Sequence, residues 1–266
     1  MNLHSLFGYF LTAQNQHGLH SPFVFDLYLN TIRSDERKAY FEVIEHIRKQ
    51  LLHSKEQLQI TDLGAGSKLN TSKIRKVSEI ARYSQKSARL GRLFYRLIQR
   101  FDCQYIFDLG TSLGITTLYL AAANPAAHLF TFEGCPNTAS EAKKNFEIWQ
   151  KNYPTYPLPR QIVGNLDHTL PPQVAYVPRL DFVFFDANHR YEPTLRYFEQ
   201  CLPKVHNDTL FVFDDIHWSE EMEAAWEQIK NHEAATVTID LWSVGLVFFR
   251  KQQAKQHFVL RWPFWK

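Results

Sequence analysis

The chain has 266 residues, of which 45% are hydrophobic and 21% are charged, and its formal net charge is +3. This composition is typical of a folded globular protein and excludes a disordered one. The small net charge gives no support for a nucleic-acid partner. No run of about 18 apolar residues predicts a transmembrane segment, and no signal-peptide pattern opens the sequence.

The cysteines indicate the compartment. Cys103, Cys135 and Cys201 lie inside apolar segments, their number is odd, and no pair has the C-x-x-C spacing of a zinc site. We therefore expect reduced, buried thiols in a cytoplasmic protein.

Residues 1–100 show only helical periodicity. Apolar side chains recur at three- and four-residue steps over 40–51, 74–81 and 90–98, which predicts three helices. Helices of this length make a poor core by themselves, so we expect them to pack against a sheet domain. The predicted organisation is an N-terminal helical extension over 1–100, followed by a second domain over 101–266.

Two terminal segments allow more than one interpretation. His17–Phe25, dense in histidine and aromatic residues, either contacts substrate or is a helix start with Ser21 as N-cap and Pro22 at the first helical position. The tail Phe258–Lys266 mixes aromatic and cationic residues, as an interfacial membrane anchor does. Packing of this tail back on the domain, or in a homodimer contact, is favoured over an anchor.

From residue 104 onward, short apolar runs alternate with helical segments, which predicts parallel strands joined by right-handed crossovers. Thr236–Leu241 and Gly245–Arg250 are too close in sequence for a crossover and predict an antiparallel hairpin. We therefore predict an α/β fold, a Rossmann-like seven-stranded mostly parallel sheet with that hairpin at its C-terminal end. The other five predicted strands are Gln104–Leu109, His128–Glu133, Gln161–Val163, Leu180–Asp186 and Leu210–Asp214, and the helices lie near 114–123, 136–150, 191–202 and 222–229.

The segment Tyr105–Thr117 reads as a strand, a glycine turn and a helix start. Asp108, Gly110 and Gly114 have the spacing D-x-G-x-x-x-G, which differs from the G-x-G-x-x-G of dinucleotide binders and disfavours an NAD-dependent oxidoreductase. Glycines let a backbone pass close to a ligand, and a helix N-terminus offers N–H donors. This segment resembles the first motif of class I S-adenosylmethionine (SAM) methyltransferases, which implies SAM as cofactor.

Further residues fit this cofactor. Glu133 ends the next predicted strand, where a carboxylate accepts the ribose hydroxyls. Asn165, after the third strand, can reach the adenine edge, with Asp167 as a competitor, or it simply forms a turn. Around the glycine turn, one of the hydroxyls of Thr111, Ser112, Thr116 and Thr117 is expected to contact the SAM carboxylate. The predicted cofactor residues are Asp108, Gly110, Thr111, Ser112, Gly114, Glu133, Asn165 and Asp186.

Ile60–Ser67 also reads as a strand and a glycine turn. Only helical sequence follows it, with no second strand that carries an acid. It is therefore the less favoured cofactor loop, although the sequence leaves it open.

Acids and histidines follow the fourth and fifth predicted strands, whose carboxyl ends share one sheet edge in a parallel sheet. Asp186-Ala-Asn-His189-Arg-Tyr and Asp214-Asp215-x-His217 resemble SAM-dependent O-methyltransferases of the catechol and caffeoyl-CoA type, and the D-x-x-H-x-Y sugar and macrolide branch. The resemblance implies a divalent metal, usually Mg²⁺, on Asp186, Asp214 and Asp215. His189 is the candidate base, because imidazole accepts protons near neutral pH, and the predicted catalytic residues are His189 and Asp186.

This chain departs from the catechol type in two ways. That type has a lysine near the position of His189, and its second fifth-strand acid is commonly Asn, where Asp215 stands here. An alternative is that Asp186 only positions SAM, while Asp214 and Asp215 cap the helix near Ser219.

The resulting prediction is a SAM-dependent methyltransferase that methylates a hydroxyl of a small molecule or a glycan-like acceptor. A nucleic-acid methyltransferase is disfavoured, because no N-P-P-Y-type motif follows the fourth strand. A non-catalytic SAM-fold binding protein remains an alternative. The acceptor is not evident from the residues.

Overall fold

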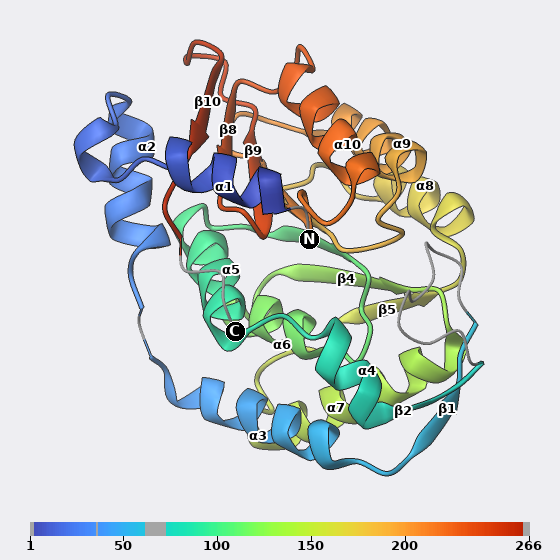
Figure 1. Cartoon of the computed structure of the whole chain (residues 1–266). Helices are drawn as coiled ribbons and strands as arrows, with labels where there is room; N and C mark the ends of the chain where they lie inside the picture. The colour runs from blue at the N-terminus through green and yellow to red at the C-terminus, as the bar shows by residue number, and fades with distance from the viewer. Residues whose placement is uncertain (1–2, 36, 62–72, 263–266) are drawn as a thin grey trace. The chain divides into compact units, whose positions relative to one another are not determined.

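The computed structural model describes residues 3–35, 37–61 and 73–262 (Figure 1). The chain forms two compact units, one of Met1–Ser34 with Val174–Lys266, called unit 1, and one of Asp35–Gln173, called unit 2. No helix within these ranges has both the length and the apolar character needed to cross a membrane. The predicted domain boundary near residue 100 stays a prediction.

Unit 2 contains a parallel sheet in the order β3-β4-β5. Helices connect the strands, as the alternation of strands and helices predicts. The apolar residues of β3 and β4 are largely buried, whereas β5 is an exposed edge strand in which 46% of the Val163 surface is accessible. These elements are β3 (Tyr105–Leu109), α6 (Ile115–Ala123), β4 (His128–Glu133), α7 (Pro136–Asn152) and β5 (Arg160–Val163).

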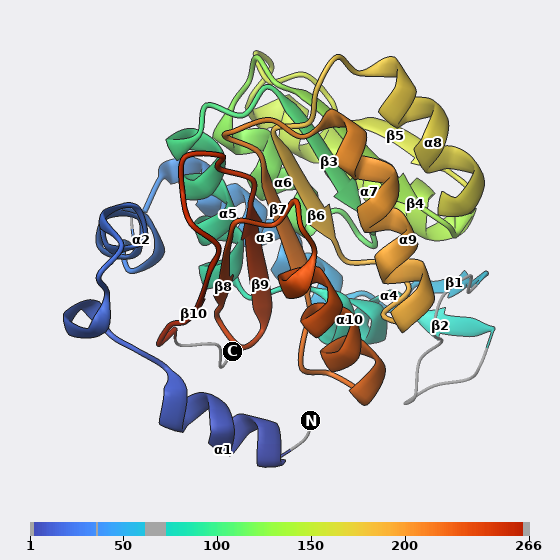
Figure 2. The same cartoon turned by 90° about the horizontal axis from the view of Figure 1, so that it is seen from above.

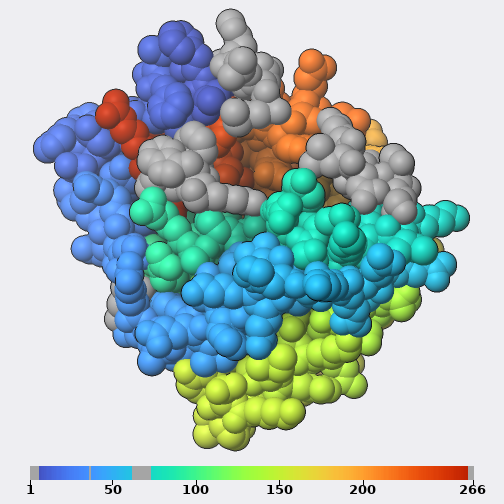
Figure 3. Space-filling model, turned by 60° about the horizontal axis from the view of Figure 1, so that its bottom comes forward, coloured from blue at the N-terminus to red at the C-terminus, as the bar shows by residue number. Residues whose placement is uncertain are grey.

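The N-terminal helices of unit 2 pack on this layer. α3 (Ala39–His53) contacts α6 and α7, and α5 (Ala88–Arg100) contacts α6. Figure 3 shows α3 and β1 lying beside α7 on the surface of unit 2. The prediction that these helices pack against the sheet domain is therefore confirmed.

The prediction that residues 1–100 contain only helices is wrong. β1 (Gln57–Gln59) and β2 (Ile74–Lys76) form a two-stranded antiparallel sheet, and α4 (Val77–Ser84) begins only after β2. Ile74, the first residue of the predicted helix over 74–81, lies in β2 with 56% of its surface exposed. The alternative glycine turn at 60–67 falls mostly within 62–72, outside the described residues.

Unit 1 contains five strands in the order β10-β8-β9-β7-β6 (Figure 2). β6 and β7 are parallel, whereas β9 pairs antiparallel with both β7 and β8, which confirms the C-terminal hairpin. β10 pairs parallel with β8 and is one strand more than the seven predicted. The elements are β6 (Phe182–Phe185), α9 (Tyr191–Cys201), β7 (Leu210–Asp214), α10 (Glu220–Asn231), β8 (Val237–Asp240), β9 (Val244–Phe248) and β10 (Gln256–Val259).

The remaining helices are α1 (Leu3–Thr12) and α2 (Pro22–Leu27) in unit 1, and α8 (Leu166–Tyr176), which follows β5. Ser21 caps α2 by accepting the Val24 N–H, and Pro22 occupies the first turn, so the cap interpretation of this segment is confirmed. β10 confirms that the tail packs back on its own unit, as far as Trp262. The chain thus has the predicted α/β, mostly parallel fold, and all three cysteines are buried.

Candidate functional site

The glycine turn after β3 has an unusual backbone. Gly110, Ser112 and Gly114 have φ angles of 121°, 48° and 81°, in the region that favours glycine. At Gly114 a Cβ atom would lie 2.5 Å from the ring of Phe146 in α7. Gly114 is therefore required both for the turn and for the close approach of α6 to α7.

Asp108 lies beneath this turn and is completely buried. Its Oδ2 accepts hydrogen bonds from the hydroxyls of Thr117 at 2.5 Å and Thr131 at 2.8 Å. These bonds join β3, β4 and α6, so Asp108 supports the turn from inside unit 2. Contact of Asp108 with a cofactor stays a prediction.

The hydroxyl of Thr111 is also used inside the unit. It lies 2.5 Å from the hydroxyl of Thr131. Because the Thr131 proton is donated to Asp108, Thr111 must be the donor of this bond. Of the four hydroxyls predicted around the turn, those of Thr111 and Thr117 are buried, and only Ser112 and Thr116 are partly exposed.

Glu133 ends β4, and its carboxylate is held by the backbone. Oε2 accepts the Ser112 N–H at 2.8 Å, and Oε1 accepts the Cys135 N–H at 2.9 Å. A carboxylate offers about four lone-pair sites, more than these two N–H donors use. The carboxylate is therefore oriented by the backbone, and its contact with ribose hydroxyls stays a prediction.

Asn165 follows β5 after Gly164, whose φ angle is 139°. Its Oδ1 accepts the Asp167 N–H at 2.9 Å, which closes a turn into α8. The turn interpretation of Asn165 is therefore confirmed, and adenine recognition stays a prediction.

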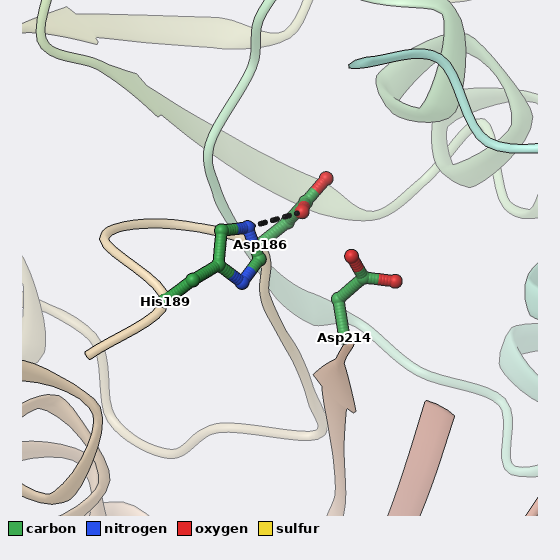
Figure 4. A group of neighbouring side chains, drawn as sticks. All are labelled: Asp186, His189 and Asp214. Carbon is green, nitrogen blue, oxygen red and sulfur yellow. Dashed lines mark ion pairs between the residues drawn. The ribbon is translucent and has the colours of Figure 1, made fainter. Parts of the chain in front are cut away.

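In unit 1, Asp186, His189 and Asp214 come together at the carboxyl ends of β6 and β7 (Figure 4). One donor atom from each lies within 4.8 Å of the others. His189 Nε2 is 3.4 Å from Asp186 Oδ1. Asn188 and His189 have φ angles of 68° and 24°, a costly conformation that turns the loop back toward Asp186.

Asp215 is not part of this group. Its φ angle of 53° bends the chain after β7. The Asp215 N–H donates to the Ser243 carbonyl at 2.8 Å, and its carbonyl accepts the Trp218 N–H at 2.9 Å. The structure thus brings together two of the three implied metal ligands, with His189 in the third place.

The N-cap of α10 is Ser219, whose hydroxyl accepts the Met222 N–H at 3.3 Å. The alternative in which Asp214 and Asp215 cap this helix is therefore wrong. Asp214 is 1% exposed and lies close to a second carboxylate. Two neighbouring carboxylates disfavour joint ionisation unless a cation or proton lies between them. Two carboxylates and one imidazole are a donor set that suits a divalent metal.

A second histidine with no predicted role fixes the loop that follows Asp214. His217 Nε2 lies 2.7 Å from Asp240 Oδ2, and the ring stacks on Trp242 with centroids 4.6 Å apart. Its Nδ1 is 3.5 Å from Glu223 Oε1. Burial lowers the pKa of His217, but the hydrogen bond and charge of Asp240, with Glu223, outweigh this and leave the pKa raised. The sequence signal was the histidine of the D-D-x-H motif.

Residues 107–216 match the model of a methyltransferase domain family. This segment contains the glycine turn, Glu133 and the Asp186–His189–Asp214 group. A search of curated proteins gives no match.

Solved structures share the fold. An O-methyltransferase from Bacillus cereus in complex with SAH is 16% identical, with a TM-score of 0.55, over 85% of this chain and 97% of that one. TomG, an O-methyltransferase from Streptomyces achromogenes in complex with SAM, is 18% identical, with a TM-score of 0.54, over 85% of this chain and 96% of that one. A putative caffeoyl-CoA O-methyltransferase from Staphylococcus aureus is 16% identical, with a TM-score of 0.55, over 85% of this chain and 97% of that one. The resemblance to class I methyltransferases predicted from the glycine turn is confirmed.

Proposed function

We propose that this protein is a SAM-dependent O-methyltransferase that methylates a hydroxyl of a small molecule or a glycan-like acceptor, with help from a divalent metal. The observation that carries the proposal is the group formed by Asp186, His189 and Asp214. It combines carboxylates that can hold a cation with a side chain that can accept a proton. The match of residues 107–216 to a methyltransferase domain supports it.

The residues of the glycine turn suit SAM. Glu133 has its carboxylate oriented by two N–H donors, and a carboxylate is a good acceptor for ribose hydroxyls. Gly110 presents backbone with no side chain, which lets a ligand come close. SAM supplies a methyl group activated by its positive sulfur, and structures with this fold bind SAM or SAH.

Asp186 and Asp214 would hold the metal, most simply Mg²⁺, because it prefers oxygen ligands. A bound metal would favour ionisation of the acceptor hydroxyl and orient it. His189 Nε2 faces Asp186, so a proton on Nε2 leaves Nδ1 as the base that takes the hydroxyl proton. Asp215 is assigned no ligand role.

The first test is to titrate the protein with SAM and, separately, with NAD in a calorimeter. We expect the protein to bind SAM and not NAD. Methyl-labelled SAM is then incubated with acceptor panels of hydroxylated small molecules, saccharides and nucleic acids. We expect label in an O-methyl product of the first two panels, lost with chelator and restored by Mg²⁺. Label in nucleic acid, or SAM binding without transfer to any panel, would contradict the proposal. A cytoplasmic location and a homodimer remain proposals of the same kind.

A further inference from the structure

The cofactor turn of unit 2 contacts a residue that lies outside the matched methyltransferase segment. Ser84 is the last residue of α4, and its Oγ lies 2.8 Å from Oγ of Ser112. Ser84 Oγ also donates to the backbone carbonyl of Ile80 at 2.8 Å. α4 is thereby joined to the turn by a hydrogen-bonded pair of hydroxyls.

The direction of the bond between the two hydroxyls follows from counting protons. A serine hydroxyl has one proton and two lone pairs. The Ser84 proton is donated to Ile80, so Ser112 must donate to Ser84. The Ser112 N–H is donated to Glu133. Both donors of Ser112 are therefore used inside unit 2, and its partly exposed Oγ offers a ligand only lone pairs.

This polarity selects the kind of group that Ser112 can bind. A carboxylate or a phosphate offers only acceptor oxygens, and these would face the lone pairs of Ser112. An ammonium offers three donors and no acceptor, so it complements them. The earlier expectation that a hydroxyl of this turn contacts the SAM carboxylate is therefore not supported for Ser112.

We propose that Ser112 Oγ accepts a hydrogen bond from the α-ammonium group of SAM, and that Ser84 is the positioning residue that fixes this polarity. The inference rests on the proposed function, because it assumes that SAM binds this turn. The same polarity would disfavour the phosphates of a dinucleotide at this turn, because their acceptor oxygens would face the lone pairs of Ser112. Without the Ser84 hydroxyl, the Ser112 proton is free to rotate toward the ligand.

The test is calorimetric titration with two probes, SAH and an SAH analogue in which hydrogen replaces the α-amino group. The variants are Ser112→Gly, which suits the positive φ angle, Ser84→Ala, and Ser84→Thr, which keeps a hydroxyl. Ser87→Ala is the matched control, because Ser87 caps α5 close to Ser84 and its hydroxyl accepts the Leu90 N–H. Thermal unfolding of each variant verifies folding.

We expect Ser112→Gly to weaken SAH binding about tenfold or more and Ser84→Ala about threefold, in line with the loss of a charge-assisted hydrogen bond and of its orientation. The affinity for the deaminated analogue should fall less than about twofold in the Ser112→Gly and Ser84→Ala variants, because this analogue lacks the ammonium group that Ser112 binds. The Ser84→Thr variant should bind SAH with the affinity of the unmodified protein. The Ser87→Ala variant should show the same change in affinity, if any, for SAH and for the deaminated analogue.

Equal losses for both probes would show that Ser84 and Ser112 only support the turn, and would overturn the inference. Unchanged SAH affinity in Ser112→Gly would overturn it as well. Both outcomes leave the proposed function intact, provided that the unmodified protein binds SAH. Failure of the unmodified protein to bind SAH or SAM would reject the proposed function and this inference together.

Discussion

Glu133 and Ser112, 21 positions apart in the chain, are joined by a hydrogen bond of 2.8 Å from the Ser112 N–H to Oε2. A second N–H, from Cys135, holds the other oxygen. The carboxylate at the end of β4 is therefore fixed before any ligand arrives. Orientation in advance lowers the entropy cost of binding.

Replacement of Glu133 tests the ribose assignment. We expect Glu133→Ala to weaken SAM binding on the order of 100-fold, because two charge-assisted hydrogen bonds are lost. Glu133→Gln keeps the shape and one acceptor and should lose less. Titration calorimetry measures both, and an affinity unchanged in Glu133→Ala would reject the assignment.

The metal group makes a prediction that separates neighbouring acids. Asp186→Asn and Asp214→Asn should abolish Mg²⁺ or Mn²⁺ binding, because each removes a charged ligand. Asp215→Asn should retain it, since Asp215 lies outside the group. Calorimetry with Mg²⁺ and electron paramagnetic resonance with Mn²⁺ report binding directly. If the Asp215 variant loses the metal as well, the group seen here is not the ligand set.

His189 is expected to act in catalysis rather than in cofactor binding. His189→Ala should lower the turnover rate on the order of 10²–10⁴-fold, which is the usual contribution of a general base. SAM affinity should change less than about twofold, because His189 is not among the residues assigned to SAM. Metal affinity in the same variant decides between base and ligand: retention supports the base, and loss supports coordination.

Gly114 is expected to be structurally essential. Gly114→Ala should destabilise the protein by about 2–4 kcal/mol, because its φ angle is 81° and the new Cβ would lie 2.5 Å from Phe146. Gly8→Ala is the matched control, since nothing lies within 4 Å of its Cβ position in α1. That change should be neutral or stabilising by about 0.5–1 kcal/mol. Urea denaturation compares the free energies of unfolding.

His217 predicts a pH dependence of stability. Its pKa is raised in the folded protein, so its stabilising contribution is complete below the unfolded pKa and is lost as pH rises through the folded pKa. His217→Asn should therefore cost more unfolding free energy near pH 5.5 than near pH 9. His257, whose pKa is lowered by burial, should show the opposite trend when replaced. If His217→Asn lowered the free energy of unfolding equally at both pH values, the raised pKa of His217 in the folded protein would be contradicted.

Much of the fold follows from local sequence patterns. The strands around Ile106 and Phe132 are apolar runs bounded by turns, and the spacing of Asp108, Gly110 and Gly114 predicted the turn where it lies. The hairpin followed from chain length, because three residues cannot make a crossover. These are properties of short segments, so they can be predicted without knowing the tertiary structure.

Other features depend on tertiary contacts and backbone angles. Positive φ angles at His189 and Asp215 turn one side chain into the metal group and leave the other out, and no pattern of residue types predicts that. α8 is not among the helices predicted from the sequence, and it contains Pro171 and Pro172, which are unfavourable inside helices. β2 was hidden because Ile74 also fits a helical stripe. The Ser84–Ser112 pair depends on packing of α4 beside the turn.

Tyr9 and Leu260 share a hydrogen bond of 2.6 Å across 251 positions of sequence. Tyr9 Oη also accepts the Trp262 N–H, and the Gln14 N–H donates to the Val259 carbonyl. During synthesis on the ribosome, α1 must therefore wait until residues 259–262 have been made before its binding surface exists. Loop closure over such a span slows folding, so we expect docking of α1 to be among the last steps and the first to reverse when the protein is heated.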